Sequence, residues 1–285
     1  MFVSGVVLAN ASLDIAFHDN SKNKLTKEDD YKVNIEYLKQ FFVGLLEADG
    51  TITVGLKNIA GLLQTGRVRM VIALKRNEEN IAMLNLIAKH IAGKVVLEHK
   101  KTYEYVTWSA QSKQDLIKVF DILKTYPFLT SRKQAQLIFA LDMLENKYTY
   151  SQFLELRNKK YEYKLQILAK LSKENLPIYF PGWLSGFIEG EGNFSLVFND
   201  KNQLRKSAFT IGQNDELHVL IWIKTYLNGD TKIIRDKPKK GGNFNYYRLH
   251  LYNVHTRKAI FNHFNSYPLL GYKAVSYNKF YNHHN

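Results

Sequence analysis

The sequence contains no cysteine and only five prolines among its 285 residues. Without cysteine there is no disulfide and no thiolate site for zinc or an iron–sulfur cluster. No apolar run approaches the roughly 18 residues that a membrane-spanning helix needs, so no membrane partner is expected. Neither a GxxxxGK[ST] phosphate loop nor an HExxH zinc motif occurs, so the sequence gives no support for P-loop nucleotide hydrolysis or zincin chemistry.

Acidic residues are few relative to basic ones. The chain has 26 Asp and Glu against 40 Lys and Arg, which gives a formal net charge of +14. An excess of this size points to a polyanion such as a nucleic acid as the partner. The hydrophobic content of 45% is enough for real cores. The length suits two domains of ordinary size or one pseudo-symmetric pair.

Two short segments are near copies of each other. Residues 42–50 read FVGLLEADG and residues 184–192 read LSGFIEGEG. In each copy, two small residues lie four positions apart on one helical face, a spacing that lets two helix backbones approach closely. These small residues are Gly44 and Ala48 in the first copy, and Gly186 and Gly190 in the second.

Each copy ends in an acid followed by glycine, Asp49-Gly50 and Glu191-Gly192. The glycines suit the left-handed position just past a helix end. If the two helices pack side by side, Asp49 and Glu191 meet at their C-terminal tips. A carboxylate is unfavourable at that end of the helix dipole, and two carboxylates repel each other. A divalent cation bound between them would relieve both problems, because hard cations take carboxylate and carbonyl oxygens.

The same order of elements follows each copy. Periodicity predicts two strands, a helix that ends before a glycine (Gly93 or Gly229), two more strands, a helix, a Tyr-Pro break and a last helix. The expected strands after the first one are 67–75, 94–98 and 103–110, then 204–213, 231–235 and 244–252; the helices between them are 78–92 and 215–227. The predicted organisation is a tail and spacer (1–30), a first repeat (31–145), a partly helical linker (146–178) and a second repeat (179–285).

The paired segments resemble the LAGLIDADG signature, and residues 34–285 resemble the single-chain, two-repeat LAGLIDADG homing endonucleases. The resemblance implies an α+β fold of two pseudo-symmetric repeats, each αββαββα, with a curved four-stranded antiparallel sheet in each forming a DNA-binding saddle. It also implies a monomer that cuts both strands of one long, asymmetric double-stranded DNA target. The implied cofactor is Mg²⁺, for which Mn²⁺ or Ca²⁺ can substitute in binding. The alternative is an RNA-splicing maturase on the same fold, which binds intron RNA without cutting; the acid pair favours cutting.

Residues 4–19 resemble a stretch of cytochrome c oxidase subunit I, and the match stops at Asp19. In-frame translation from a host exon into an intron reading frame would produce such a segment. The resemblance therefore implies a mitochondrial, organelle-encoded protein that acts on an intronless copy of the oxidase gene.

The family resemblance also assigns site residues. Asp49 and Glu191 hold metal together with the backbone carbonyls of Ala48 and Gly190, while Glu47 and Glu189 are expected to be structural. The basic residues five places after each Tyr-Pro proline, which act near the scissile phosphates, are Arg132 and Lys273. A glutamine that orders water is Gln213 in the second repeat, and its counterpart in the first is Lys75 or Asn77.

The exposed faces of the two sheets are expected to read DNA, because a major groove admits a β-ribbon. The outward strand positions proposed to contact bases are Thr53, Lys57, Ser195, Asn199, Lys206, Thr210, Tyr246, Arg248 and His250. The positions proposed to contact phosphates are Arg67, Arg69, Lys201, Lys239 and Lys240.

Overall fold

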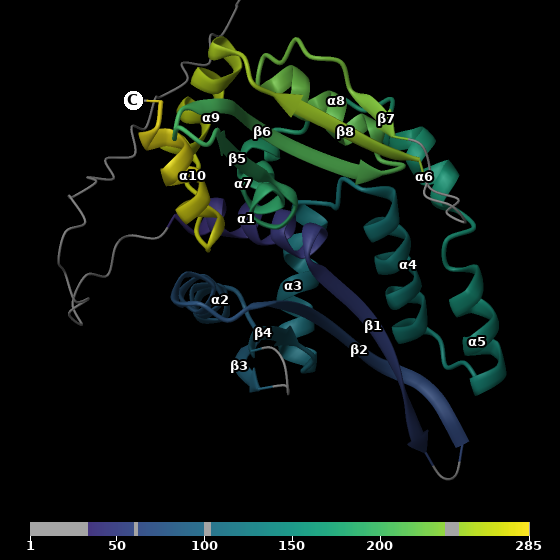
Figure 1. Ribbon diagram of the computed structural model, residues 1–285. Coiled ribbons are helices and arrows are strands. Elements are labelled where there is room, and N and C mark those ends of the chain that lie inside the picture. The colour runs from purple at the N-terminus through teal and green to yellow at the C-terminus, as the bar shows by residue number, and fades with distance from the viewer. Residues whose placement is uncertain (1–33, 60–61, 100–103, 237–244, 285) are drawn as a thin grey trace, which may run out of the picture. The chain divides into compact units, whose positions relative to one another are not determined.

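The computed structural model describes residues 34–59, 62–99, 104–236 and 245–284 (Figure 1). The oxidase-like N-terminal segment and the lysines at 239 and 240 lie outside these ranges, and the side chain of Lys57 is also outside the description. In the described part of the chain, no helix is both long and apolar enough to cross a membrane.

The first repeat, hereafter repeat 1, begins with the helix that carries the first copied segment. Its elements are α1 (Ile35–Ala48), β1 (Gly50–Ile59), β2 (Leu62–Lys75), α2 (Glu78–His90), β3 (Lys94–His99), β4 (Glu104–Ala110), α3 (Lys113–Thr125) and α4 (Ser131–Glu145). Two helices follow before the second copied segment, α5 (Tyr150–Lys159) and α6 (Lys164–Leu171).

The second repeat, repeat 2, has the same order. Its elements are α7 (Phe180–Glu191), β5 (Asn193–Phe198), β6 (Leu204–Asn214), α8 (Leu217–Tyr226), β7 (Ile234–Asp236), β8 (Tyr246–Leu251), α9 (Val254–Ser266) and α10 (Lys273–Asn282). Each repeat forms one four-stranded antiparallel sheet, in the order β1-β2-β4-β3 or β5-β6-β8-β7. This confirms the predicted α+β fold of two repeats.

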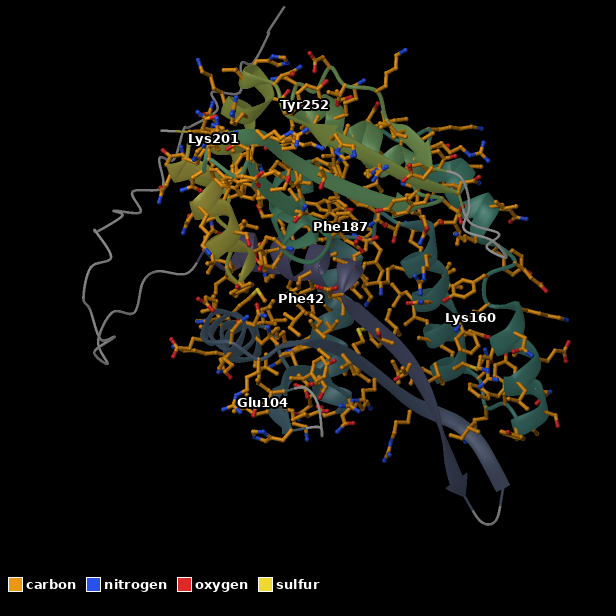
Figure 2. The ribbon with its side chains drawn as sticks, viewed as in Figure 1. Phe42, Glu104, Lys160, Phe187, Lys201 and Tyr252 are labelled. Atoms are coloured by element: carbon orange, nitrogen blue, oxygen red, sulfur yellow. The ribbon has the colours of Figure 1, made fainter. Side chains whose placement is uncertain are left out.

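Helices α1 and α7 pack side by side (Figure 1), and their glycines lie at the contact. A Cβ atom on Gly44 would overlap the carbonyl oxygen of Trp183, and one on Gly186 would overlap that of Phe41. The aromatic core continues from this interface: the rings of Trp183 and Phe187 stack with centroids 4.5 Å apart. Figure 2 shows Phe42 and Phe187 in the interior, in contrast to the exposed Lys201 and Tyr252.

The left-handed glycines were predicted correctly only in part. Gly93 has φ of +88°, as expected after α2. After α8 the left-handed residue is Asn228, with φ of +52°, and the Gly229 amide donates back to the Lys224 carbonyl. Gly192 is extended, with φ of −75°, and Gly50 begins strand β1, so the expectation for these two was wrong. Both must be small because a Cβ would run into the preceding helical turn, at Leu46 or Ile188.

Candidate active site

The two acids of the copied segments lie at the ends of the paired helices. Asp49 is the C-cap residue of α1, and Glu191 is the last residue of α7. The helix contact brings them together, since a Cβ atom on Gly190 would lie 2.7 Å from Oδ2 of Asp49. Both residues are exposed. The surrounding protein desolvates both carboxyl groups and raises their pKa values, and the charge of Asp49 raises that of Glu191 further.

The chemistry of this acid pair fits a hard divalent cation. Two carboxylates held at the negative ends of two helix dipoles are destabilised, and a cation would favour their charged forms. The last carbonyls of a helix have no intrahelical partner, which makes the carbonyls of Ala48 and Gly190 available as further oxygen donors. Among the described residues, no group of three or more His, Asp or Glu side chains could hold a metal ion. The acid pair with carbonyl oxygens is therefore the donor set to consider.

Gln213 lies at the acid pair. Its side chain makes a hydrogen bond to Glu191, which partly opposes the effect of burial on the pKa of that carboxyl. The strand registers decide its counterpart in repeat 1. Thr51 pairs with Val71, and the matching residue Asn193 pairs with Thr210, so Gln213 corresponds to Leu74. Lys75 lies one residue further, and successive strand residues face opposite sides of a sheet. The registers thus match neither Lys75 nor Asn77 to Gln213, and Asn77 caps α2.

Two lysines act electrostatically on the acid pair, Lys133 from α4 and Lys273 from α10. Each lowers the pKa values of both Asp49 and Glu191. Lys133 is 7% exposed and its Nζ atom donates to the carbonyl oxygen of Gly50. Burial lowers the pKa of Lys133 to about 8, against the pull of the acids around it. Lys133 was not among the predicted site residues.

Arg132, which the distance from the Tyr-Pro proline selected, points elsewhere. Its side chain is exposed and hydrogen-bonds Tyr161, which follows α5. The spacing gave the right segment, but a count along the chain does not say which of two adjacent basic side chains turns inward. A catalytic role for Arg132 stays a prediction.

Glu47 and Glu189, the acids two places before the pair, hold the segments that carry these basic residues. Glu47 accepts from the amides of Leu129 and Thr130, and from Trp183 Nε1 at 2.6 Å. Glu189 accepts from the amides of Gly271 at 3.1 Å and Lys273 at 2.8 Å. Burial nonetheless raises the pKa of Glu47 to about 7. Both side chains are buried and hydrogen-bonded within the fold, whereas Asp49 and Glu191 are exposed.

Most of the predicted DNA-contacting residues in the strands share one face of their sheet, opposite the core. In the first sheet Thr53 pairs with Arg69, and Arg67 follows on the same face. In the second sheet Thr210 pairs with His250. The same face also carries Ser195, Lys206, Tyr246 and Arg248. The Nε atoms of Arg69 and Arg248 are buried and have no hydrogen-bond partner in the described part of the chain.

Asn199 and Lys201 differ from this group because they lie in the turn between β5 and β6. Oδ1 of Asn199 accepts from the amides of Lys201 at 3.0 Å and Gln203 at 2.8 Å, so the side chain stabilises the turn itself. A base-reading role for Asn199 would require it to leave these contacts.

The protein has one site assembled from a carboxylate of each repeat, and one sheet in each repeat with basic residues on its outer face. These features define its class. Two copies of one unit are fused in a single chain, and each supplies half of a shared site.

Comparison with known proteins gives the family. The chain belongs to the LAGLIDADG endonuclease family, whose model matches residues 42–141 and 184–284. It is 32% identical over 253 residues to a probable intron-encoded endonuclease aI3 of Dictyostelium citrinum, covering 88% of this chain and 97% of that protein. It is 30% identical to the protein of the same name from Debaryomyces hansenii, covering 98% of this chain. The match takes in 48% of the Debaryomyces protein, so the chain spans about half of that relative's length.

Solved structures show the same fold. The LAGLIDADG meganuclease I-CpaMI bound to uncleaved DNA superposes with a TM-score of 0.63 at 16% identity, covering 86% of this chain and 90% of that one. The homing endonuclease I-LtrWI bound to target DNA gives a TM-score of 0.60 at 20% identity, covering 87% and 89%.

Proposed function

We propose that the protein is a site-specific DNA endonuclease that makes a double-strand break in one long, asymmetric target and depends on a divalent metal, Mg²⁺. The observation that carries the proposal is the meeting of Asp49 and Glu191 at the ends of α1 and α7. The names of the relatives, intron-encoded endonucleases, support cleavage, and the DNA-bound structures with the same fold support DNA as the substrate. The intact acid pair favours cutting over the RNA-maturase alternative.

The described residues divide the work of phosphodiester hydrolysis. A divalent cation at the acid pair would activate water and neutralise charge on the attacking and leaving oxygens. Lys133 and Lys273 place positive charge near the phosphates, where negative charge builds up during the reaction. Gln213 orients Glu191 through its hydrogen bond. The outward arginines and lysines of the sheets bind the backbone, with an affinity that falls steeply with salt.

The proposed target is a mitochondrial cytochrome oxidase subunit I gene that lacks the intron, and the proposed protein is an organelle-encoded monomer. The support is the oxidase-like N-terminal segment, together with a Schizosaccharomyces pombe relative named Cox1-I1b that is 27% identical over 219 residues. Since one chain contributes both acids, the site is complete without a second copy.

The test is cleavage of a plasmid that carries the uninterrupted oxidase gene. With Mg²⁺ the protein should produce one double-strand break, and a chelator should prevent it. Asp49→Asn or Glu191→Gln should abolish cutting while binding stays within about tenfold, because a decade of affinity is only about 1.4 kcal/mol beside many phosphate contacts. Full-rate cutting by either variant would rule out the acid pair as the site.

A further inference from the structure

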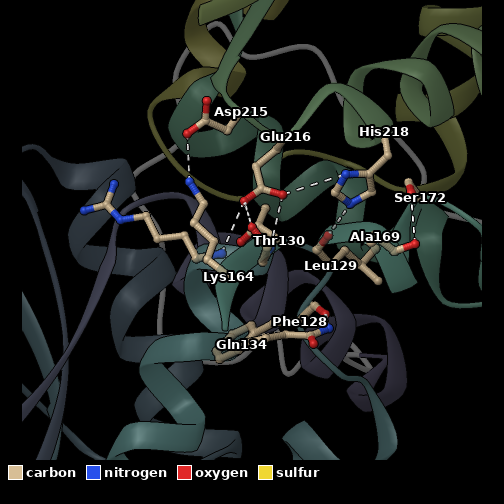
Figure 3. Close-up of polar contacts among 12 residues, drawn as sticks. Phe128, Leu129, Thr130, Gln134, Lys164, Ala169, Ser172, Asp215, Glu216 and His218 are labelled. Carbon is tan, nitrogen blue, oxygen red and sulfur yellow. Dashed lines mark hydrogen bonds and ion pairs between the residues drawn. The ribbon is translucent and has the colours of Figure 1, made fainter. Parts of the chain in front are cut away.

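The segment between the first Tyr-Pro break and Lys133 is held by side chains of the other repeat, in addition to Glu47 of its own. We call residues 127–133 the basic segment of repeat 1. The hydroxyl of Tyr179 donates to the Pro127 carbonyl at 2.7 Å, and Nε2 of His218 donates to the Leu129 carbonyl at 2.8 Å. Both donors are largely buried, at 8% and 5% exposed. Figure 3 shows His218 beside Leu129.

Glu216 makes the most extensive of these contacts. Its carboxylate, only 2% exposed, accepts from the Ser131 amide at 3.1 Å, the Ser131 hydroxyl at 2.5 Å and the Arg132 amide at 3.2 Å. These amides open the first turn of α4, whose own N-cap residue Thr130 makes no side-chain cap bond. An anion at a helix N-terminus satisfies free amides and is favoured by the helix dipole. Glu216 therefore caps a helix of repeat 1 from repeat 2.

Glu216 is not used to cap its own helix. It is the residue just before α8, and its side chain makes no cap bond there. The preceding residue, Asp215, has a left-handed backbone with φ of +63° and accepts from the Asn245 amide at 2.9 Å. Lys164 of α6 pairs with Asp215 at 2.8 Å in a part-buried position (Figure 3). These contacts fix the turn that presents Glu216 to α4.

The same arrangement occurs in the other direction. When the repeats are aligned on Gly93 and Gly229, the glycines that follow α2 and α8, Asn80 matches Glu216, although Asn80 is the third residue of α2 and Glu216 precedes α8. Oδ1 of Asn80, a residue 7% exposed, accepts from the Tyr272 amide at 3.0 Å, directly before Lys273. The hydroxyl of Tyr37 on α1 donates to the Pro268 carbonyl, as Tyr179 does to Pro127. The basic segment of repeat 2, residues 268–273, is thus held by repeat 1 as well as by Glu189 of its own repeat.

We propose that each repeat positions the basic residue of the other, with Glu216 placing Lys133 and Asn80 placing Lys273. The proposal rests on the proposed endonuclease function. Capping by Glu216 sets where α4 begins, and Lys133 lies in the first turn of that helix with Nζ on Gly50. Glu216 and Asn80 are positioning residues, which act on the phosphates only through the two lysines.

The test measures the cleavage rate of each DNA strand separately, since the proposal assigns Lys133 to one strand and Lys273 to the other. In single-turnover assays with strand-specific labels, Glu216→Ala should slow one strand about tenfold or more relative to the other. Asn80→Ala should bias cleavage in the opposite direction. DNA affinity should change by less than about threefold for both variants. Glu78→Gln is the matched control: an exposed carboxylate in the first turn of α2, expected to leave both rates unchanged.

Equal slowing of both strands by Glu216→Ala, or no slowing, would overturn the proposal. If that variant does not fold, the nearly isosteric Glu216→Gln is measured against the same criterion, with a smaller bias in the same direction expected because one acceptor oxygen remains.

A second readout does not depend on cleavage, so it separates failure of this inference from failure of the proposed function. Amine-reactive footprinting with mass spectrometry should find Lys133 protected in the wild type and exposed in Glu216→Ala, with Lys273 unchanged. Unchanged protection of Lys133 would contradict positioning by Glu216 even if the wild type cuts no DNA.

Discussion

The surroundings of the site shift the pKa values of its ionisable residues from their ordinary values. Burial raises the pKa values of Asp49 and Glu191, and lowers that of Lys133 to about 8. Burial thus disfavours the charged form of each group, and the opposite charges within the site offset this only in part. A cation for the acids and a phosphate for the lysine would supply further opposite charge. Acidic and basic groups with shifted pKa values that lie close together are typical of a functional site.

Lys133 and Lys273, rather than Arg132, should carry most of the electrostatic stabilisation. Lys133→Ala and Lys273→Ala should each lower the single-turnover cleavage rate by about 10²-fold or more, the range for a lost electrostatic stabiliser. Arg132→Ala should lower it far less, since the guanidinium faces Tyr161. Rates are compared with equilibrium affinity for the same duplex. A greater loss of rate for Arg132→Ala than for Lys133→Ala would assign the electrostatic role to Arg132, the residue predicted from spacing. An affinity loss as large as the rate loss would show that the lysine binds DNA and does not stabilise the transition state.

His263 should make stability depend on pH. Its Nε2 lies 3.0 Å from Ser185 Oγ, which itself donates to the Tyr267 carbonyl, and Nδ1 lies 3.1 Å from the Tyr226 hydroxyl. These partners suit a neutral ring, and burial lowers the pKa of His263 to about 3 from 6.5. The unfolded chain then binds the extra proton below about pH 6.5, so the free energy of unfolding falls as pH drops.

The size of this effect can be measured by denaturant unfolding. Between pH 7.5 and 5.5, His263 should account for a loss of about 1.4 kcal/mol. His263→Gln should remove that part of the pH dependence, while the exposed His255→Gln should retain it. Identical pH dependence in the wild type and His263→Gln would show that the ring is not held neutral.

At the scale of elements, the close contact of α1 and α7 was predictable because it leaves a mark in the sequence: small residues at helical spacing on both partners. Gly44 and Gly186 confirm that expectation. The cap glycines were less predictable. Gly50 and Gly192 are required because a side chain would not fit, and not because the backbone is left-handed there. Asn228 takes the left-handed position because asparagine tolerates it. A glycine in the sequence does not say which of these demands it meets.

The helix interface should tolerate no side chain at Gly44. Gly44→Ala should reduce the free energy of unfolding by about 1–3 kcal/mol, and Gly44→Leu by more, because the backbone of Trp183 occupies the space. Gly55→Ala is the matched control, since a Cβ there meets Arg67 only at 3.6 Å, an ordinary contact. It should stay within about 0.5 kcal/mol of the wild type. A Gly44→Leu protein with an unchanged melting temperature would show that the helices do not meet at this residue.

At the scale of the whole molecule, the two-repeat architecture was predictable because each repeat carries the same order of periodic segments. The contacts between repeats were not, because a hydrogen bond between Glu216 and Ser131 joins residues far apart in sequence with no local pattern to mark it. The counterpart of Gln213 in repeat 1 was not predictable either. Strand register matches Gln213 to Leu74, whereas the sequence offered only Lys75 or Asn77.

The two repeats are alike in fold and unlike in the residues predicted to face DNA. Thr53 and Arg67 line the first sheet, and Lys206 and His250 the second. Because base edges are read by individual side chains, two different faces predict two different half-sites and no palindrome. A duplex that repeats either half-site as an inverted pair should therefore be cut more slowly than the natural target.

The proposed position of the target rests on the resemblance of the N-terminal segment to cytochrome oxidase subunit I. An intron that inserts into a site divides it, so the allele that carries the intron becomes resistant. The exon bases that encode residues 16–19, up to Asp19, should form one half of the recognised sequence, and the exon bases that follow them in an uninterrupted gene should form the other. A duplex that spans this junction should be cut near its middle, while one interrupted there by intron sequence should survive under the same conditions. Equal cleavage of both duplexes, or of neither, would show that the N-terminal segment does not indicate the target sequence.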